Sequence, residues 1–131
     1  MVSILLADEN PVTLEVLKES LETEGHQVRT TSVHRAIPLW QKHRKDIDVI
    51  VTGKSMGRDE NAGVDLAVGL RKLKCDIPII LQSDTITPDS QISRFKAAGN
   101  VSQKNIFLDN ISLKPLLKAI ENCTAASVQK G

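Results

Sequence analysis

Short apolar segments alternate with amphipathic ones along this chain. Two of the apolar segments, Val49 to Thr52 and Ile77 to Leu81, contain no charged residue, which is typical of strands covered on both faces of a parallel sheet. The pattern predicts strands at residues 2–7, 26–31, 49–52, 77–81 and 101–104. Apolar positions at helical spacing predict helices at residues 11–24, 36–45, 62–74, 88–99 and 113–122.

Residues at the expected helix ends support these boundaries. Asn10 can cap the first helix, Pro11 suits its first position, and Gly25 supplies the left-handed conformation that stops it. Thr87 and Ser112 are expected to cap the last two helices in the same way. Pro38 must lie in the first turn of its helix or impose a kink, because a proline deeper in a helix removes a hydrogen bond.

The segments between these elements are predicted to be connectors. Lys54 to Asn61 is polar, contains Gly57 and is expected to form a long, mobile loop. Asn105 to Ile111 is expected to be a connector, and Thr124 to Gly131 a frayed tail of small and polar residues. The chain is therefore expected to form one domain over residues 1–123 with a tail at 124–131.

Alternating strands and helices favour an α/β fold with a parallel sheet and helices on both faces. Right-handed crossovers leave a doubly wound, flavodoxin-like (βα)5 sheet as the economical topology. Ligand crevices of such sheets lie at the carboxyl ends of the strands. We therefore expect the functional residues to follow the predicted strands.

Composition and charge narrow the function only a little. The chain has 131 residues, 40% hydrophobic and 25% charged, with a formal net charge of +1. This balance gives no sign of a nucleic-acid or membrane partner. Cys75 and Cys123 have no CxxC spacing, which favours reduced thiols in a cytoplasmic protein, and no apolar run approaches the length of a membrane span.

Four of the expected strand ends are informative: three have reactive side chains, and one has a glycine where a reactive side chain is expected. Asp8 and Glu9 follow the first strand, Ser83 follows the fourth and Lys104 ends the fifth. The central strand ends instead in Gly53. Two acids, a hydroxyl and an ammonium are thus expected to converge around a glycine.

These motifs together resemble the receiver domain of two-component response regulators. Ile4-Leu5-Leu6-Ala7-Asp8-Glu9-Asn10-Pro11 resembles the family's acidic-pair motif, and Asp48 to Met56 resembles its third-strand motif with Gly53 at the phosphoacceptor aspartate. Ile77 to Ser83 resembles the strand that ends in the switch hydroxyl. Gly53 follows Glu9 by 44 residues, Ser83 follows Gly53 by 30, and Lys104 follows Ser83 by 21, where the family has its lysine.

The resemblance implies an impaired site. In the family the acidic pair and the aspartate hold Mg²⁺, the aspartate accepts a phosphoryl group, and the lysine and hydroxyl grip it. Gly53 can neither ligate a metal nor form an acyl phosphate. Asp84, where the family has a small residue, would repel a phosphoryl group. A residual pocket of Asp8, Glu9, Ser83, Asp84 and Lys104 is expected, with no required cofactor and with Mg²⁺ on Asp8 and Glu9 the weaker expectation.

Further departures from the family affect the switch that reports phosphorylation. Gly57 replaces a proline, Val101 stands where an aromatic switch residue is common, and Asn105 stands where a proline follows the lysine. The resemblance therefore implies that the reporting part of the switch is degraded along with its trigger.

Simpler interpretations of these residues stay open. Gly53 can serve a positive φ, Ser83 can be a loop hydroxyl or a local cap, and Lys104 is expected to pair with Asp8 or Glu9 rather than to act in catalysis. Surface positions are favoured over metal ligation for all three histidines, His26, His34 and His43.

We interpret the chain as a non-enzymatic receiver domain that is not phosphorylated at Gly53 and acts as a protein-interaction module. The contact face is expected at residues 87–104 and the last helix, 113–122, because the family signals there. One alternative is a phosphoacceptor that uses a displaced acid, Asp59 or Asp84. Another is a domain that binds a small molecule or anion at Lys104 and Ser83. The partner and the oligomeric state are not indicated.

Overall fold

The computed structural model describes residues 2–53, 61–83, 89–99, 105–108 and 113–130. Five parallel strands form one sheet in the order β2-β1-β3-β4-β5. The strands are β1 (Ser3–Ala7), β2 (Gln27–Thr31), β3 (Val49–Gly53), β4 (Ile79–Gln82) and β5 (Asn105–Leu108). The α-helices are α1 (Pro11–Thr23), α2 (Ala36–His43), α3 (Ala62–Lys72), α4 (Asp89–Gly99) and α5 (Leu113–Lys130), and short 3₁₀ helices η1 (Val33–Arg35) and η2 (Arg44–Asp46) flank α2. The predicted flavodoxin-like architecture is confirmed.

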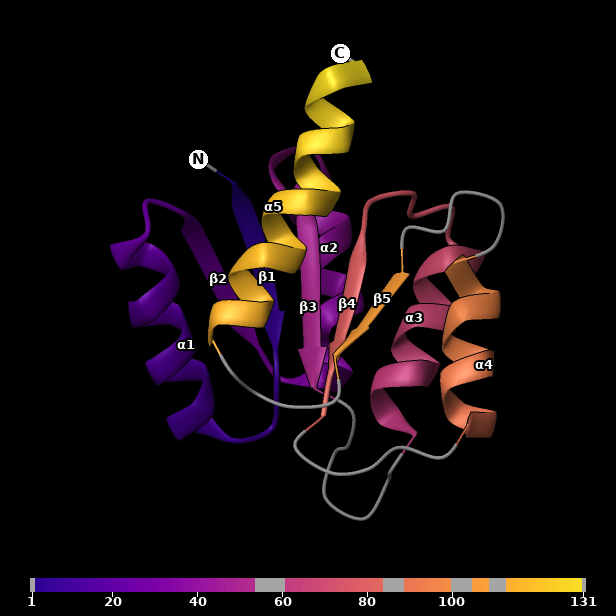
Figure 1. The fold of residues 1–131 in the computed structure, drawn as a ribbon. Coiled ribbons are helices and arrows are strands. Elements are labelled where there is room, and N and C mark those ends of the chain that lie inside the picture. The colour runs from indigo at the N-terminus through magenta and orange to yellow at the C-terminus, as the bar shows by residue number, and fades with distance from the viewer. Residues whose placement is uncertain (1, 54–60, 84–88, 100–104, 109–112, 131) are drawn as a thin grey trace.

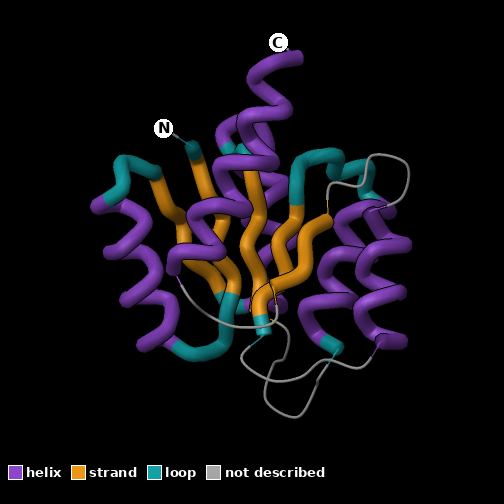
Figure 2. The backbone as a smooth tube through the Cα atoms, in the orientation of Figure 1, coloured by secondary structure: helices purple, strands orange, loops and turns teal. Residues whose placement is uncertain are grey.

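Helices cover both faces of the sheet, α1 and α5 on one side and α2, α3 and α4 on the other (Figures 1 and 2). Burial on both faces explains why the central strand β3 contains no charged residue. Ile50 packs into the cluster beneath α2 and α3, whereas its neighbour Val51 packs beneath α1 and α5, and both are fully buried. Full burial of such a side chain contributes about 1.5–3 kcal/mol, so both faces of this strand stabilise the fold.

The predicted ends of the first helix are confirmed. Asn10 is the cap of α1: its Oδ1 accepts hydrogen bonds from the backbone N–H groups of Val12 (2.9 Å) and Thr13 (3.4 Å), and Pro11 occupies the first helical position. Gly25 has φ +92°, the left-handed conformation expected after the helix. Pro38 is the third residue of α2 and therefore lies in the first turn, where it causes no break.

The last strand and the last helix differ from the prediction. Asn105 to Ile111 was expected to be a connector, but Asn105–Leu108 forms β5, because Ile106, Phe107 and Leu108 supply apolar contacts to both layers. The predicted strand at 101–104 lies outside the described residues. Helix α5 continues to Lys130, beyond the predicted end at Asn122 and through the segment expected to be a tail.

A buried polar network joins β5 to the helices of one layer. Arg71 of α3 donates to the carbonyl oxygens of Cys75 (2.6 Å) and Ile77 (2.8 Å) and to Oδ1 of Asn105 (2.5 Å). The Asn105 amide donates in turn to the carbonyl oxygen of Phe95 in α4, at 2.8 Å. Burial lowers the pKa of Arg71, and these carbonyl and amide oxygens compensate for part of the water that its guanidinium loses, while its Nε has no partner among the described residues.

None of the described helices is both long and apolar enough to cross a membrane.

Candidate functional site

Three of the predicted site residues lie at the same end of the sheet, where β1, β3 and β4 end (Figure 1). The strand register brings them together: Ala7, which precedes Asp8, is paired with Thr52, and Gly53 is paired with Gln82, which precedes Ser83. The predicted convergence of Asp8, Gly53 and Ser83 is therefore a direct result of parallel pairing.

The carboxylate of Asp8 faces the place where a side chain on Gly53 would begin. A Cβ atom built on Gly53 would lie 2.6 Å from Asp8 Oδ2 and 3.2 Å from its Cγ. The other oxygen, Oδ1, accepts a hydrogen bond of 2.8 Å from the backbone N–H of Asn10. Asp8 is thus held by its own loop in a position where its carboxylate would clash with the Cβ atom of any side chain at residue 53.

Backbone conformation does not explain the glycine. Gly53 is not among the residues with positive φ, so the suggestion that it serves such a turn is wrong. It is the last residue of β3 and is fully enclosed within the sheet. A side chain at this position would first meet the carboxylate of Asp8, which would have to move.

Glu9 points to a different part of the molecule. Its Oε1 accepts a hydrogen bond of 3.0 Å from the backbone N–H of Val33, the first residue of η1, and lies 3.8 Å from Nδ1 of His34. Glu9 therefore satisfies an otherwise orphaned donor at the start of the 3₁₀ helix. The two adjacent acids diverge, one towards Gly53 and one towards the β2–α2 connection.

This divergence bears on metal binding. Mg²⁺ takes hard oxygen ligands in a near-ideal octahedron, commonly from one or two carboxylates together with water and phosphate. Within the described part of the chain, no group of three or more His, Cys, Asp or Glu residues could hold a metal ion. Gly53 contributes no side-chain oxygen and Glu9 is directed at Val33, so Asp8 is the described carboxylate that faces the end of β3.

Ser83 and Gln82 form the β4 side of the site. Ser83 is buried, and its backbone N–H donates to the carbonyl oxygen of Leu108 at 3.0 Å. Gln82 is also buried, and its Oε1 has no hydrogen-bond partner among the described residues, an arrangement that costs about 1–3 kcal/mol. Sequence reasoning did not assign Gln82 to the site, although it is a polar residue that directly follows an apolar run.

The remaining predicted residues, Asp59, Asp84 and Lys104, lie outside the described residues, and their assignment stays a prediction. The described strand at this edge of the sheet is β5, and its register is set by β4. Asn105 begins β5 and pairs with Ile79 at the start of β4, whereas the strand end nearest Ser83 is Leu108. At the Ser83 end of the sheet, β5 therefore ends in Leu108.

The histidines keep their predicted surface positions only in part. His34 is more than half exposed and lies beside Glu9. His26 is partly buried, and its Nδ1 accepts a 3.3 Å hydrogen bond from the backbone N–H of Val2. The contact of His34 with Glu9 was missed because the two residues are far apart in the chain and no spacing rule connects them.

Comparisons with known proteins agree on one family. The family model described as the response regulator receiver domain matches residues 4–110. The chain is 34% identical over 96 residues to the DNA-binding transcriptional regulator NtrC of Azospirillum brasilense, a match that covers 73% of this chain. The chain spans only 19% of that relative's length.

Solved structures share the fold at low sequence identity. A response regulator receiver domain protein from Clostridium thermocellum has a TM-score of 0.83 with 20% identity over the whole of both chains. Chemotaxis protein CheY4 of Vibrio cholerae has a TM-score of 0.77 with 21% identity, covering 94% of this chain and 98% of that one. Response regulator TrrA of Thermotoga maritima, in complex with Mg²⁺ and BeF, has a TM-score of 0.75 with 22% identity, covering 94% and 99%.

Proposed function

This chain belongs to the response regulator receiver domain family of two-component signalling, and from that premise we propose that it acts without phosphorylation at position 53. In this proposal it is a protein-interaction module and not a phosphoacceptor. The observation that carries the proposal is the side chain of Asp8, which faces Gly53 where the family's aspartate would begin.

Two chemical arguments support the proposal. An acyl phosphate requires a carboxylate nucleophile, and glycine has none. The nearest described acid, Asp8, is held by the Asn10 N–H and would repel a phosphoryl group arriving beside Gly53. No resident Mg²⁺ is assigned, because Glu9 bonds the N–H of Val33.

We place the partner-binding face at α4, β5 and α5 as far as Asn122. Receiver domains interact with partner proteins, and β5 is the edge strand of the sheet, flanked by α4 on one face and α5 on the other (Figure 1). The strand in this face is Asn105–Leu108, which replaces the segment expected from the sequence. Without a phosphoryl trigger, this surface has one arrangement unless another ligand favours a second one.

The test is incubation with acetyl phosphate and Mg²⁺, followed by intact-mass measurement. A parallel sample receives beryllofluoride and Mg²⁺, and the backbone amide resonances of α4 and β5 are recorded. We expect no phosphoryl adduct and unchanged amide resonances. A stable adduct of one phosphoryl group that hydroxylamine removes would refute the proposal.

Two variants identify the nucleophile if an adduct forms. Loss of the adduct in Asp59→Ala or in Asp84→Ala would establish a displaced phosphoacceptor in place of the silent module. An adduct-free protein whose α4 and β5 amides nevertheless shift with beryllofluoride would also refute the proposal, because it would show that the site still senses a phosphoryl-like ligand.

A further inference from the structure

A groove opens at the β2 edge of the sheet, on the side opposite β5. Its cavity of about 540 Å³ is lined by Thr30, Thr31, Arg35, Pro38, Leu39 and Lys42. Strand β2 supplies one wall, and η1 with α2 supplies the other. Pro38 and Leu39 give the groove an apolar part, and the cations Arg35 and Lys42 are exposed.

The wall made by β2 has backbone groups that the sheet does not use. β2 pairs with β1 alone, and in this parallel ladder Gln27 N–H donates to Val2 while the carbonyl oxygen of Thr31 accepts from Asp8. Because bonding alternates along a parallel strand, the N–H and C=O groups of Val28 and Thr30 point away from β1. Such an edge is a template for another extended chain.

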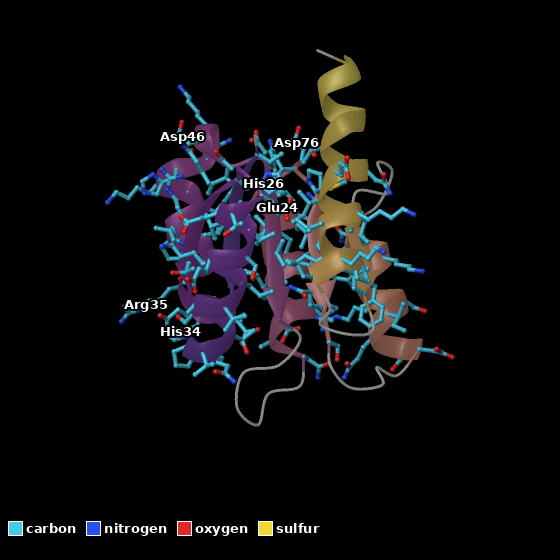
Figure 3. The ribbon with its side chains drawn as sticks, turned by 60° about the vertical axis from the view of Figure 1, so that its left-hand side comes forward. Glu24, His26, His34, Arg35, Asp46 and Asp76 are labelled. Atoms are coloured by element: carbon cyan, nitrogen blue, oxygen red, sulfur yellow. The ribbon has the colours of Figure 1, made fainter. Side chains whose placement is uncertain are left out.

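The positive charge around the groove favours an acidic partner segment. Residues 26–45 contain five Lys or Arg and all three histidines but no Asp or Glu, in a protein of net charge +1. Arg44 is engaged with the Trp40 ring, 5.3 Å from its centroid, whereas Arg35 and Lys42 line the groove. Figure 3 shows Arg35 projecting from the ribbon beside His34, at the end of the molecule away from Asp46 and Asp76.

We propose that this groove binds an extended, acidic peptide segment of a partner protein as an added strand on β2. The segment's backbone pairs with the N–H and C=O groups of Val28 and Thr30, its carboxylates approach Arg35 and Lys42, and apolar side chains cover Pro38 and Leu39. Main-chain bonds supply affinity and the two cations supply selectivity. This site is separate from the α4–β5–α5 face, because β2 and β5 are opposite edges of the sheet.

A fluorescein-labelled peptide of about six residues, alternating Glu and Val, is the probe. Its binding to the intact chain is measured by fluorescence anisotropy at low and high salt. The test variant is Arg35→Glu/Lys42→Glu. The control, Lys72→Glu/Lys96→Glu, changes the net charge equally at two exposed helical positions outside the groove.

We expect binding that weakens with salt, at least about a tenfold loss of affinity in the groove variant and little change in the control. Equal losses in the two variants would overturn the proposal, because they would show attraction to the overall charge alone. Thermal unfolding of each variant establishes that it is folded.

Hydrogen exchange tests strand addition separately from charge. The amides of Val28 and Thr30 are expected to exchange quickly in the isolated protein and slowly with saturating peptide, while Gln27 stays protected throughout. A peptide of the same sequence, N-methylated along one strand edge, keeps its charges but cannot form the ladder and should bind weakly. Binding without protection of Val28 and Thr30, or tighter binding of a single-stranded oligonucleotide through Arg35 and Lys42, would refute the proposal.

Discussion

Replacing Gly53 by alanine should destabilise the protein, although alanine normally stabilises a strand relative to glycine. The new Cβ would lie 2.6 Å from Asp8 Oδ2, whereas ordinary contacts begin near 3.4 Å, so the Asp8 carboxylate must move. We expect this movement to disrupt the 2.8 Å hydrogen bond that Oδ1 of Asp8 accepts from Asn10, and hydrogen bonds to charged groups contribute about 1.5–3 kcal/mol. Against a gain of about 0.5–1 kcal/mol from replacing a strand glycine, the expected net loss is about 0.5–2.5 kcal/mol.

The sign of the effect should reverse when Asp8 is absent. In an Asp8→Ala background the same Gly53→Ala change meets no carboxylate, and we expect it to stabilise by about 0.5–1 kcal/mol. Urea titrations of the four proteins, followed by the fluorescence of the buried Trp40, give each free energy of unfolding. Gly69→Ala in α3 is the matched control: its added Cβ would meet the flexible end of Ile37, so its effect should be the same in both backgrounds.

Additivity would refute this reasoning. If Gly53→Ala changes the free energy of unfolding equally with and without Asp8, within about 0.5 kcal/mol, the carboxylate does not restrict position 53. The proposal that position 53 is not phosphorylated would then lose its structural support. Only the chemical argument, that glycine has no nucleophile, would remain.

Three further outcomes follow from polar groups that folding shields from water. Asn105→Ala should destabilise by about 2–4 kcal/mol in urea titrations, because it leaves the Arg71 guanidinium and the Phe95 carbonyl without their shared partner; a loss below about 0.5 kcal/mol would contradict the network. Burial raises the pKa of Cys123 to about 11, so alkylation by iodoacetamide, mapped by peptide mass, should rise about tenfold per pH unit from neutral pH and level off only near that value. The same shift favours the folded state most below pH 9 and is lost between pH 9 and 11, so Cys123→Ser should flatten the fall in stability over that range.

The sequence was most informative where local chemistry decides the structure. Charge-free runs predicted β3 and β4, and the Asn10–Pro11 pair predicted the start of α1, because capping and burial depend on neighbouring residues. The convergence of Asp8, Gly53 and Ser83 also followed, since parallel strands must end at one edge.

Long-range geometry was not predictable in the same way. The resemblance favoured a strand ending at Lys104, but the position of β5 depends on Asn105, which bonds Arg71 and Phe95 from distant helices. Nor could the pattern show that Glu9 would turn to Val33 while Asp8 turned to Gly53. Both outcomes depend on rotamers and on partners that approach only after the chain has folded.

The contacts of Asn105 have a consequence for the rate at which a partner would associate with the proposed face at α4, β5 and α5. Asn105 bonds α3 and α4 at once, and Arg94 of α4 forms a 2.6 Å ion pair with Asp65 of α3. Rotating α4 against β5 would break these bonds together, so they oppose movement of α4 relative to α3 and β5. A partner that docks on this face encounters a surface already shaped for it, and the observed association rate should rise linearly with partner concentration, with no slow isomerisation phase.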